Sequence, residues 1–263
     1  LVVADAATLR RIGSIDDILF GDETKSADGR ALCGAGLGKV YFGTSSGIYV
    51  IDLDKVEITG KIQGSDPDGN AADLYNGQIG DMVLAGTHVF AICQSTGVYI
   101  IDTATDQIVK FIADTQVQGV TQASDGTVWY ATIDADKCSN FVALDMNTFE
   151  VKETVVVPAE IGSVTCGWGA WRTTQFTAAK SIPALFFAPG SSISNGGAGN
   201  YFRYDIDTKE YTRLIKVTDM DAHTPGIKQG AYGSIRYDDR SGELIVGTTE
   251  YKASGHYRYN WTH

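Results

Sequence analysis

Hydrophobic residues along this chain come in short runs, and one arrangement of these runs keeps returning. In GIYVIDLDKVEITGKI (47–62) an apolar run ends at an aspartate, a polar turn follows, and a second apolar run ends at an isoleucine. The anchor residues of the successive copies are Asp5, Asp52, Asp102, Asp145, Asp205 and, in a shortened copy at the end, Asn260. Ten positions after each of the first five anchors stand Ile15, Ile62, Ile112, Val155 and Ile215. This shared spacing indicates a structural repeat with a period of roughly 40 to 60 residues.

Each copy has the features of a β-hairpin. Runs rich in Val, Ile, Tyr and Phe favour strands. An aspartate at the entrance of a turn can accept hydrogen bonds from backbone N–H groups two or three residues later, which fixes the turn locally. The apolar residue after the turn then returns to the same face of the sheet as the run before it.

Two further short strands precede each hairpin. The nearer ones are VYFGT (40–44), VFAIC (89–93), VWYAT (128–132), LFFAP (185–189) and LIVGT (244–248). Four strands per repeat are typical of a β-propeller blade. No long segment has apolar residues at helical spacing, which disfavours a sheet alternating with helices, and a β-sandwich would need no repeat. We therefore predict an all-β fold, with one β-propeller domain over residues 1–263 built from about six to seven four-stranded antiparallel blades.

The connections between the predicted strands are unequal. Turns that join the first strand of a blade to the second, or the third to the fourth, are short, as in DLDK (52–55). Connections from the second strand to the third lengthen along the chain, up to PGSSISNGGAGN (189–200). Connections from one blade to the next are expected to be long throughout, as in PAEIGSVTCGWGAWR (158–172). Both kinds of long connection belong to the same face of a propeller, so we expect that face to carry the function.

Large amphipathic side chains gather in these long connections. Tryptophan and tyrosine provide wide contact areas with few rotors, and arginine adds a planar hydrogen-bonding group. The candidate ligand-binding residues are Tyr75, Trp168, Trp171, Arg172, His223, Lys228, Tyr232, Tyr251 and His256. They suit a partly planar, polar ligand such as a sugar ring or a macrocycle. The alternative is that these aromatic residues only fill the loops and the mouth of the channel.

A catalytic alternative involves part of the same set. His223 and His256 fall in predicted loops of neighbouring repeats, beside further candidates such as Lys228. A Tyr/His pair near a cation has the groups needed to abstract a proton next to a sugar carboxylate, as in a polysaccharide lyase. Composition does not supply the geometry of such a site. We therefore assign no catalytic residue and favour binding over catalysis.

No metal or cofactor site is predicted. The stretch SDPDGNAAD (65–73) carries the aspartates of a calcium loop, but the glycine and glutamate positions of an EF-hand hold Ala71 and Gly77. We expect this stretch to be a polar turn. The glycine-rich stretches GAGLG (34–38) and GSSISNGGAGN (190–200) are not followed by a helical pattern, so they do not predict a phosphate-binding loop.

Composition narrows the class of protein. A net charge of −11 argues against nucleic acid as a partner, because phosphate binding needs clustered lysine and arginine. With 30 glycines and only 5 prolines, the chain fits a packed protein with many tight turns. Cys33 and Cys93 are expected to be buried thiols in strands. Cys138 and Cys166 lie in predicted loops on one face, where a disulfide and two free thiols are both open alternatives.

The repeated phrase also carries a family resemblance. Together with VWYAT and LIVGT before it, it resembles the YVTN/YncE-like β-propellers. Three longer stretches are SDGTVWYAT (124–132), CGWGAWR (166–172) and AYGSIRYDDRSGELIVGTTEY (231–251). They are similar to surface-layer-type propeller lipoproteins of Bacteroidota that carry a domain of unknown function. The likeness spans the whole chain.

The resemblance implies a secreted protein at the cell surface (outer membrane) or in the periplasm, with membrane attachment only through a lipid anchor outside this chain. One branch of these propellers captures corrinoids for a TonB-dependent transporter. We therefore expect a non-enzymatic binding protein for a corrinoid or glycan, or for a partner protein. The alternatives are a polysaccharide lyase or hydrolase, and an interaction scaffold for an outer-membrane transporter. Because the sequence starts and stops inside hairpin phrases, we also expect it to be part of a longer chain.

Overall fold

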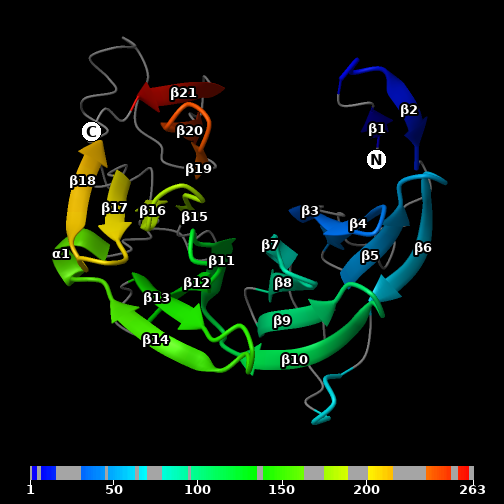
Figure 1. The fold of residues 1–263 in the computed structure, drawn as a ribbon, viewed down its shortest axis with the longest axis horizontal. Coiled ribbons are helices and arrows are strands. Elements are labelled where there is room, and N and C mark those ends of the chain that lie inside the picture. Colours follow the sequence, from blue (N-terminus) through cyan, green and yellow to red (C-terminus); the bar gives the residue numbers. More distant parts are fainter. Residues whose placement is uncertain are drawn as a thin grey trace. The chain divides into compact units, whose positions relative to one another are not determined.

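The computed structural model describes residues 2–4, 7–15, 31–44, 47–62, 65–69, 79–93, 96–134, 139–162, 175–188, 201–215, 235–249 and 254–260. The chain divides into two compact units, Leu1–Val117 and Gln118–His263, and each unit is described by itself. Antiparallel sheets make up both units, as the strand arrows of Figure 1 show.

The first unit contains a two-stranded sheet followed by two four-stranded sheets. The small sheet pairs β1 (Val2–Ala4) with β2 (Arg11–Ser14). The next consists of β3 (Ala31–Gly36), β4 (Lys39–Thr44), β5 (Gly47–Asp52) and β6 (Glu57–Ile62). The third consists of β7 (Ile79–Ala85), β8 (His88–Cys93), β9 (Gly97–Asp102) and β10 (Gln107–Ala113). In both larger sheets the strands are neighbours in chain order, which is the order predicted for a blade.

The second unit repeats this pattern. One sheet consists of β11 (Val117–Gln122), β12 (Val128–Ile133), β13 (Ser139–Leu144) and β14 (Val151–Val156). After a four-residue helix, α1 (Ala159–Gly162), comes a sheet of β15 (Gln175–Ala178), β16 (Ala184–Ala188), β17 (Tyr201–Asp205) and β18 (Tyr211–Ile215). The last sheet has three described strands, β19 (Ile235–Asp238), β20 (Glu243–Thr249) and β21 (Ser254–Asn260).

An aspartate fixes the turn between the third and fourth strand of each four-stranded sheet, as predicted. Asp102 Oδ1 accepts hydrogen bonds from the backbone N–H of Ala104 at 3.0 Å and of Thr105 at 2.8 Å. Asp52, Asp145 and Asp205 accept the same pair of bonds in their own turns. These bonds stabilise the ionised carboxylate, so the pKa of each of the four aspartates lies below its ordinary value.

The same turn requires a left-handed residue four positions after the anchor. The positive φ angles there are 55° at Val56, 56° at Asp106, 59° at Phe149 and 63° at Lys209. Bulky residues adopt this region at a cost of about 1–2 kcal/mol each. The aspartate bonds and the pairing of the flanking strands offset that cost, so the turn conformation is conserved while its occupant varies.

A β-bulge explains why the apolar residue stands ten positions after the anchor. In the β9–β10 pair, Asp102 faces Gln107, and a shift between Ile108 and Lys110 then brings Ile112 opposite Val98. The other hairpins contain the same shift and place Ile62 opposite Ile48, Val155 opposite Phe141, and Ile215 opposite Tyr201. One inserted residue thus restores the inward direction of the returning strand.

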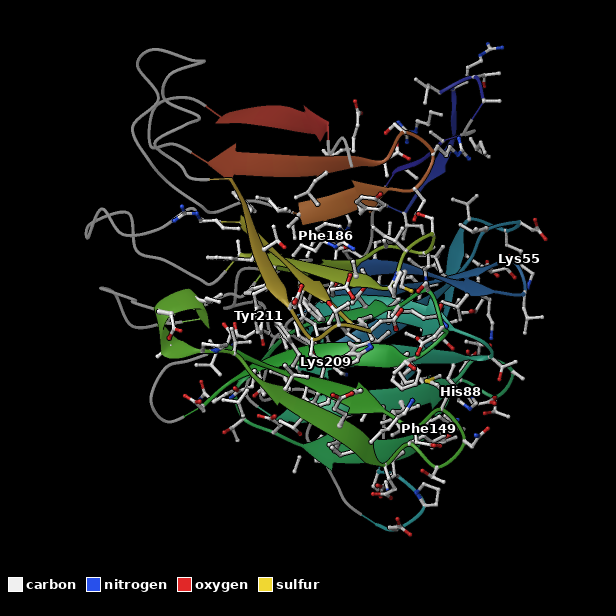
Figure 2. All side chains as sticks on the ribbon, turned by 60° about the vertical axis from the view of Figure 1, so that its left-hand side comes forward. Lys55, His88, Phe149, Phe186, Lys209 and Tyr211 are labelled. Carbon is white, nitrogen blue, oxygen red and sulfur yellow. The ribbon has the colours of Figure 1, made fainter. Side chains whose placement is uncertain are left out.

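Within each unit, neighbouring sheets pack through apolar side chains. In the first unit, Cys33 and Cys93 are both buried in the core between sheets β3–β6 and β7–β10, as the sequence predicted, and burial raises the pKa of Cys33 to about 11. In the second unit, Phe186 stacks on Tyr237, with ring centroids 4.9 Å apart, between sheets β15–β18 and β19–β21 (Figure 2). Neighbouring sheets in a unit are therefore held together by a shared apolar interface.

A partly buried polar contact also joins the two larger sheets of the first unit. Lys39 Nζ, on β4, donates to Asp106 Oδ1 at 2.7 Å and to the carbonyl oxygen of Thr103 at 2.6 Å. Tyr41, which is fully buried on the same strand, donates its hydroxyl to Asp106 Oδ1 at 2.5 Å. Burial and this carboxylate together raise the pKa of Tyr41. A residue of one turn therefore serves as the counter-ion of the adjacent sheet.

One expectation about the connections is wrong. The connection from β10 to β11 consists only of residues 114–116, so the connections between blades are not long throughout. Here Asp114 N bonds Thr96 O at 3.1 Å, and Asp114 Oδ1 accepts from Gln116 N at 3.0 Å. These bonds turn the chain directly into the next strand. The other connections between sheets, residues 15–30, 63–78, 157–174 and 216–234, are long as predicted.

We predict that Asp102→Ala lowers the free energy of unfolding by about 1 kcal/mol at pH 7, because two backbone donors lose their acceptor. Asp102→Asn, which keeps Oδ1, serves as the control and should stay closer to wild type. The folded-state pKa of Asp102 is lowered. The advantage of wild type over Asp102→Asn should therefore be complete above the unfolded-state pKa of about 3.9 and decline as the pH falls below it. Urea unfolding between about pH 3 and pH 7 measures the stability of the three proteins and its pH dependence. If the stability difference between wild type and Asp102→Asn grew on acidification, the turn mechanism would be contradicted.

Gly97 provides a second test of the fold. It has a φ of 148°, and a Cβ there would lie 2.0 Å from the carbonyl oxygen of Ile112 on the adjoining strand. Gly97→Ala should therefore destabilise the protein by about 3 kcal/mol. Gly34→Ala is the matched control, because an added Cβ meets no atom within 4 Å, and its stability should stay within about 0.5 kcal/mol of wild type. If Gly97→Ala and Gly34→Ala changed the thermal midpoint equally, Gly97 would not lie as close to the carbonyl oxygen of Ile112 as the structure has it.

Candidate functional site

Most of the predicted ligand-binding residues lie outside the described part of the chain. These are Tyr75, Trp168, Trp171, Arg172, His223, Lys228, Tyr232 and Tyr251. Cys138 and Cys166 lie outside it too. The grouping of these residues on one binding surface stays a prediction.

His256 is placed differently from the prediction. It lies within β21, with its backbone opposite Gly247 of β20, and not in a loop. The two strands pair residue for residue over Glu243–Thr249 and Ser254–Asn260, so the connection between them shortens to residues 250–253. The alternating run that ends in Tyr257 and Tyr259 continues the strand pattern through His256, and this pattern outweighed the polar residues that had indicated a loop.

The described residues contain a different polar group, at one end of sheet β11–β14. At this end β12 finishes, β13 begins, and residues 134–138 connect them. Because neighbouring strands are antiparallel, β11 also begins and β14 also ends here, followed by the long connection 157–174. This end of the sheet, which we call the loop-bearing edge, therefore carries the connections that were expected from the sequence to be functional.

Five polar residues lie at this end of the sheet, on its two faces, and we refer to them as the Asn140 cluster. They are Gln118 of β11, Thr132 of β12, Asp134, and Ser139 and Asn140 of β13. Asn140 is 7% exposed, Gln118 is 9% exposed and Ser139 is fully buried. Asn140 faces Thr132 in the strand register. Buried polar residues usually have a structural or a binding partner, so their concentration at one strand end needs an explanation.

A hydrogen bond fixes the orientation of the Asn140 side chain. Asn140 Nδ2 donates to Asp134 Oδ2 at 3.1 Å. An ionised carboxylate can only accept, so the amide nitrogen has to point toward Asp134 and the amide oxygen away from it. Asn140 Oδ1 is buried, and among the described residues no donor reaches it. An unsatisfied buried acceptor costs about 1–3 kcal/mol, which favours a partner from outside the chain.

Two of the other sheets place glycine where Asn140 stands, whereas the repeat with the anchor Asp205 has Asn200 there. The residue five positions before the anchor is Gly47 in the β3–β6 sheet and Gly97 in the β7–β10 sheet, with φ angles of 124° and 148°. These glycines follow very short connections. In sheet β11–β14 the connection is longer, and the same position carries a side chain. Sequence analysis missed this exchange of glycine for asparagine, although the repeat alignment contains it.

Two buried tyrosine hydroxyls without a partner among the described residues lie in apolar surroundings. Tyr201 is fully buried among residues such as Phe186 and Ile235, and burial raises the pKa of its hydroxyl. Tyr211 packs on the cluster around Phe187, and the desolvation of its hydroxyl raises its pKa to about 12. Each hydroxyl stands among hydrophobic side chains, so these atoms do not form a polar group like the one at Asn140.

Two further searches bear on the site. Among the described residues, no three His, Cys, Asp or Glu side chains gather to hold a metal ion. Asp66, from the stretch that resembled a calcium loop, is buried and accepts a hydrogen bond from the backbone N–H of Phe111 at 3.2 Å. In the described ranges there is also no helix of the length and apolarity required to span a membrane.

Comparison with protein families assigns the chain. A family model described as a domain of unknown function, DUF5074, matches residues 1–263. The chain belongs to the DUF5074 family. This agrees with the resemblance to propeller proteins that carry a domain of unknown function. No curated protein sequence matches this DUF5074 chain significantly.

The DUF5074 chain is similar in fold to solved structures of extracellular domains from B. thetaiotaomicron. It is similar to the extracellular domain of BT4673, described as a hybrid two-component system, with 11% identity and a TM-score of 0.57 over 94% of this chain and 30% of that one. It is also similar to the corresponding domain of BT3049, with 16% identity and a TM-score of 0.55 over 86% of this chain and 27% of that one. The chain thus spans less than a third of either structure.

Identities this low show the fold and nothing beyond it. With the repeated sheets, the likeness confirms the predicted all-β fold, a β-propeller of four-stranded antiparallel blades. The predicted single domain over residues 1–263 stays a prediction.

The Asp134–Asn140 contact leads to a stability prediction. Asp134→Ala removes the acceptor of a buried amide, so we expect the free energy of unfolding to fall by about 1–2 kcal/mol. Asp207→Ala is the control, because this aspartate is exposed in the turn of another sheet. It should change the thermal midpoint little. Equal midpoints for the two variants would show that the contact does not contribute.

Proposed function

We propose that this DUF5074 chain is a non-enzymatic binding domain that works outside the cytoplasm and captures its ligand at the loop-bearing edge of its blades. The observation that carries the proposal is the Asn140 cluster, which places a buried amide and a carboxylate at that edge. Ligand sites combine a few placed polar groups with apolar and aromatic surroundings. The predicted residues Trp168 and Trp171 belong to residues 157–174, which leave the same edge of sheet β11–β14.

The location outside the cytoplasm is supported by fold likeness. The solved structures that the chain resembles are described as extracellular domains. A cell-surface or periplasmic position is consistent with the acidic composition, which gives no affinity for nucleic acid.

The ligand class follows from the groups at the edge. Amide and carboxylate side chains form directional hydrogen bonds, and indole rings stack on flat apolar surfaces. A glycan offers both hydroxyl groups and flat ring faces, and a corrinoid offers a wide ring with amide arms. We favour these two ligands and a TonB-dependent transporter as the partner that would receive them.

Binding is favoured over hydrolysis by the make-up of the cluster. Glycoside hydrolysis generally uses two carboxyl groups on either side of the scissile bond. The Asn140 cluster contains one, Asp134, and that carboxylate is engaged by the Asn140 amide. This arrangement suits recognition better than proton transfer.

A ligand panel tests the proposal. We expect soluble glycans or a corrinoid such as cobinamide to raise the thermal midpoint of the wild-type chain by a few degrees, since a bound ligand stabilises the folded state by mass action. Trp168→Ala or Trp171→Ala should reduce this shift. Phe149→Ala is the control, because Phe149 lies in a hairpin turn at the opposite edge of sheet β11–β14 (Figure 2).

Two outcomes would replace the proposal. If the panel gives no shift while an outer-membrane protein co-purifies with the chain, an interaction scaffold is the better description. If uronate polymers gain the ultraviolet absorbance of unsaturated sugars in the presence of the chain, the protein is a lyase.

A further inference from the structure

The hydrogen-bonding state of the Asn140 cluster restricts what can bind there. The Asn140 amide nitrogen carries two N–H donors, one of which bonds Asp134 Oδ2 at 3.1 Å, and the atom without any partner among the described residues is the acceptor. What remains is Oδ1, a neutral acceptor, on a side chain that is 7% exposed. A group that satisfies it has to be a hydrogen-bond donor.

The charge at this point distinguishes between classes of donor. A cationic amine gains most from direct contact with a carboxylate. Here the Asp134 carboxylate is in contact with the amide nitrogen, and the amide oxygen is the atom left to meet a ligand. A neutral amide oxygen suits a neutral donor such as a hydroxyl group. Thr132, which faces Asn140 in the strand register, is itself hydroxyl-bearing and uncharged.

The strand geometry shows that the cluster is an alteration of a standard blade. Gly47 and Gly97 close the corresponding position in two other sheets, where a Cβ at Gly97 would strike the backbone of β10. In sheet β11–β14, Asn140 pairs with Val156 of β14 and is not among the residues with positive φ. The backbone at this position has therefore changed from the glycine conformation to one that accepts a side chain, and that side chain is an amide.

We propose that Asn140 Oδ1 accepts a hydrogen bond from a hydroxyl group of a sugar, and that Asp134 is a positioning residue that holds the amide in the required orientation. This inference rests on the proposed function and narrows its ligand to a polyhydroxylated one. Asn140 is then a specificity residue, because a ligand that lacks the hydroxyl group leaves a buried acceptor unpaired.

Calorimetric titration with methyl glycosides of glucose, galactose, mannose and N-acetylglucosamine tests the assignment. Asn140→Leu has nearly the same size and removes the acceptor, so the dissociation constant of the sugar that binds wild type should rise on the order of tenfold. Asn140→Leu removes the unpartnered acceptor but also the bond to Asp134 Oδ2, so the free energy of unfolding should fall by no more than the loss of about 1–2 kcal/mol expected for Asp134→Ala. Asn147→Leu, in the hairpin turn at the other end of the same sheet, should bind as wild type does.

Asn140→Gly provides a second variant if leucine perturbs folding, since glycine is the residue that two other sheets carry at this position. Monodeoxy versions of the same glycoside complete the test. Removal of the hydroxyl group that contacts Asn140 should weaken binding to wild type but cause no further loss in the Asn140 variants, because the two changes delete one bond.

The outcomes separate the inference from the proposed function. If wild type binds a sugar and the Asn140 variants bind it equally well, the inference is wrong and Asn140 Oδ1 is satisfied by internal water. If choline or spermidine binds and the glycosides do not, a cationic ligand replaces the hydroxyl. If wild type binds corrinoid but no sugar, the proposed function holds and this inference fails. If nothing in either panel binds, both are overturned.

Discussion

The aspartate-capped, bulged hairpin is the constraint on which the rest of the structure depends. Its carboxylate holds two backbone N–H groups, which sets a turn whose fifth residue has to be left-handed. The bulge that follows shifts the register by one residue, and side chains alternate between faces with a period of two. Without that shift, Ile112 would not meet Val98, and the fourth strand would present its polar face to the core. Local turn chemistry therefore decides which face of each blade is apolar.

The parts of the fold that the sequence predicted well are those governed by short-range interactions. The anchors at Asp52, Asp102 and Asp145, and the strands around them, could be located because turn and strand preferences act over a few residues. The short β10–β11 connection could not be found in this way, because it depends on where Asp114 finds backbone partners. The strand placement of His256 depended on pairing with Gly247, a contact between segments that sequence patterns do not specify.

The candidate site was harder to predict than the fold for a related reason. Aromatic residues in long connections attract attention in a sequence, whereas a buried asparagine in a strand does not. The significance of Asn140 becomes apparent only when it is compared with Gly47 and Gly97 in the same position of the repeat. Its unpartnered oxygen further requires knowledge of what Asp134 does to the amide. The repeat that contains Asp205 also has an asparagine at this position, Asn200, so a repeat protein can change the residue at one position in some copies while other copies keep the glycine.

The contact of Lys39 and Tyr41 with Asp106 has a consequence for how such a chain can evolve. Blade repeats are commonly gained or lost as whole modules, but here a lysine on one module depends on a carboxylate supplied by the next. Removing the module that carries Asp106 would leave the half-buried ammonium group of Lys39 without its counter-charge. Removing one partner of such an ion pair destabilises a protein more than replacing both partners by apolar residues. A recombination that separates these two modules should therefore cost stability that one keeping both in place would not.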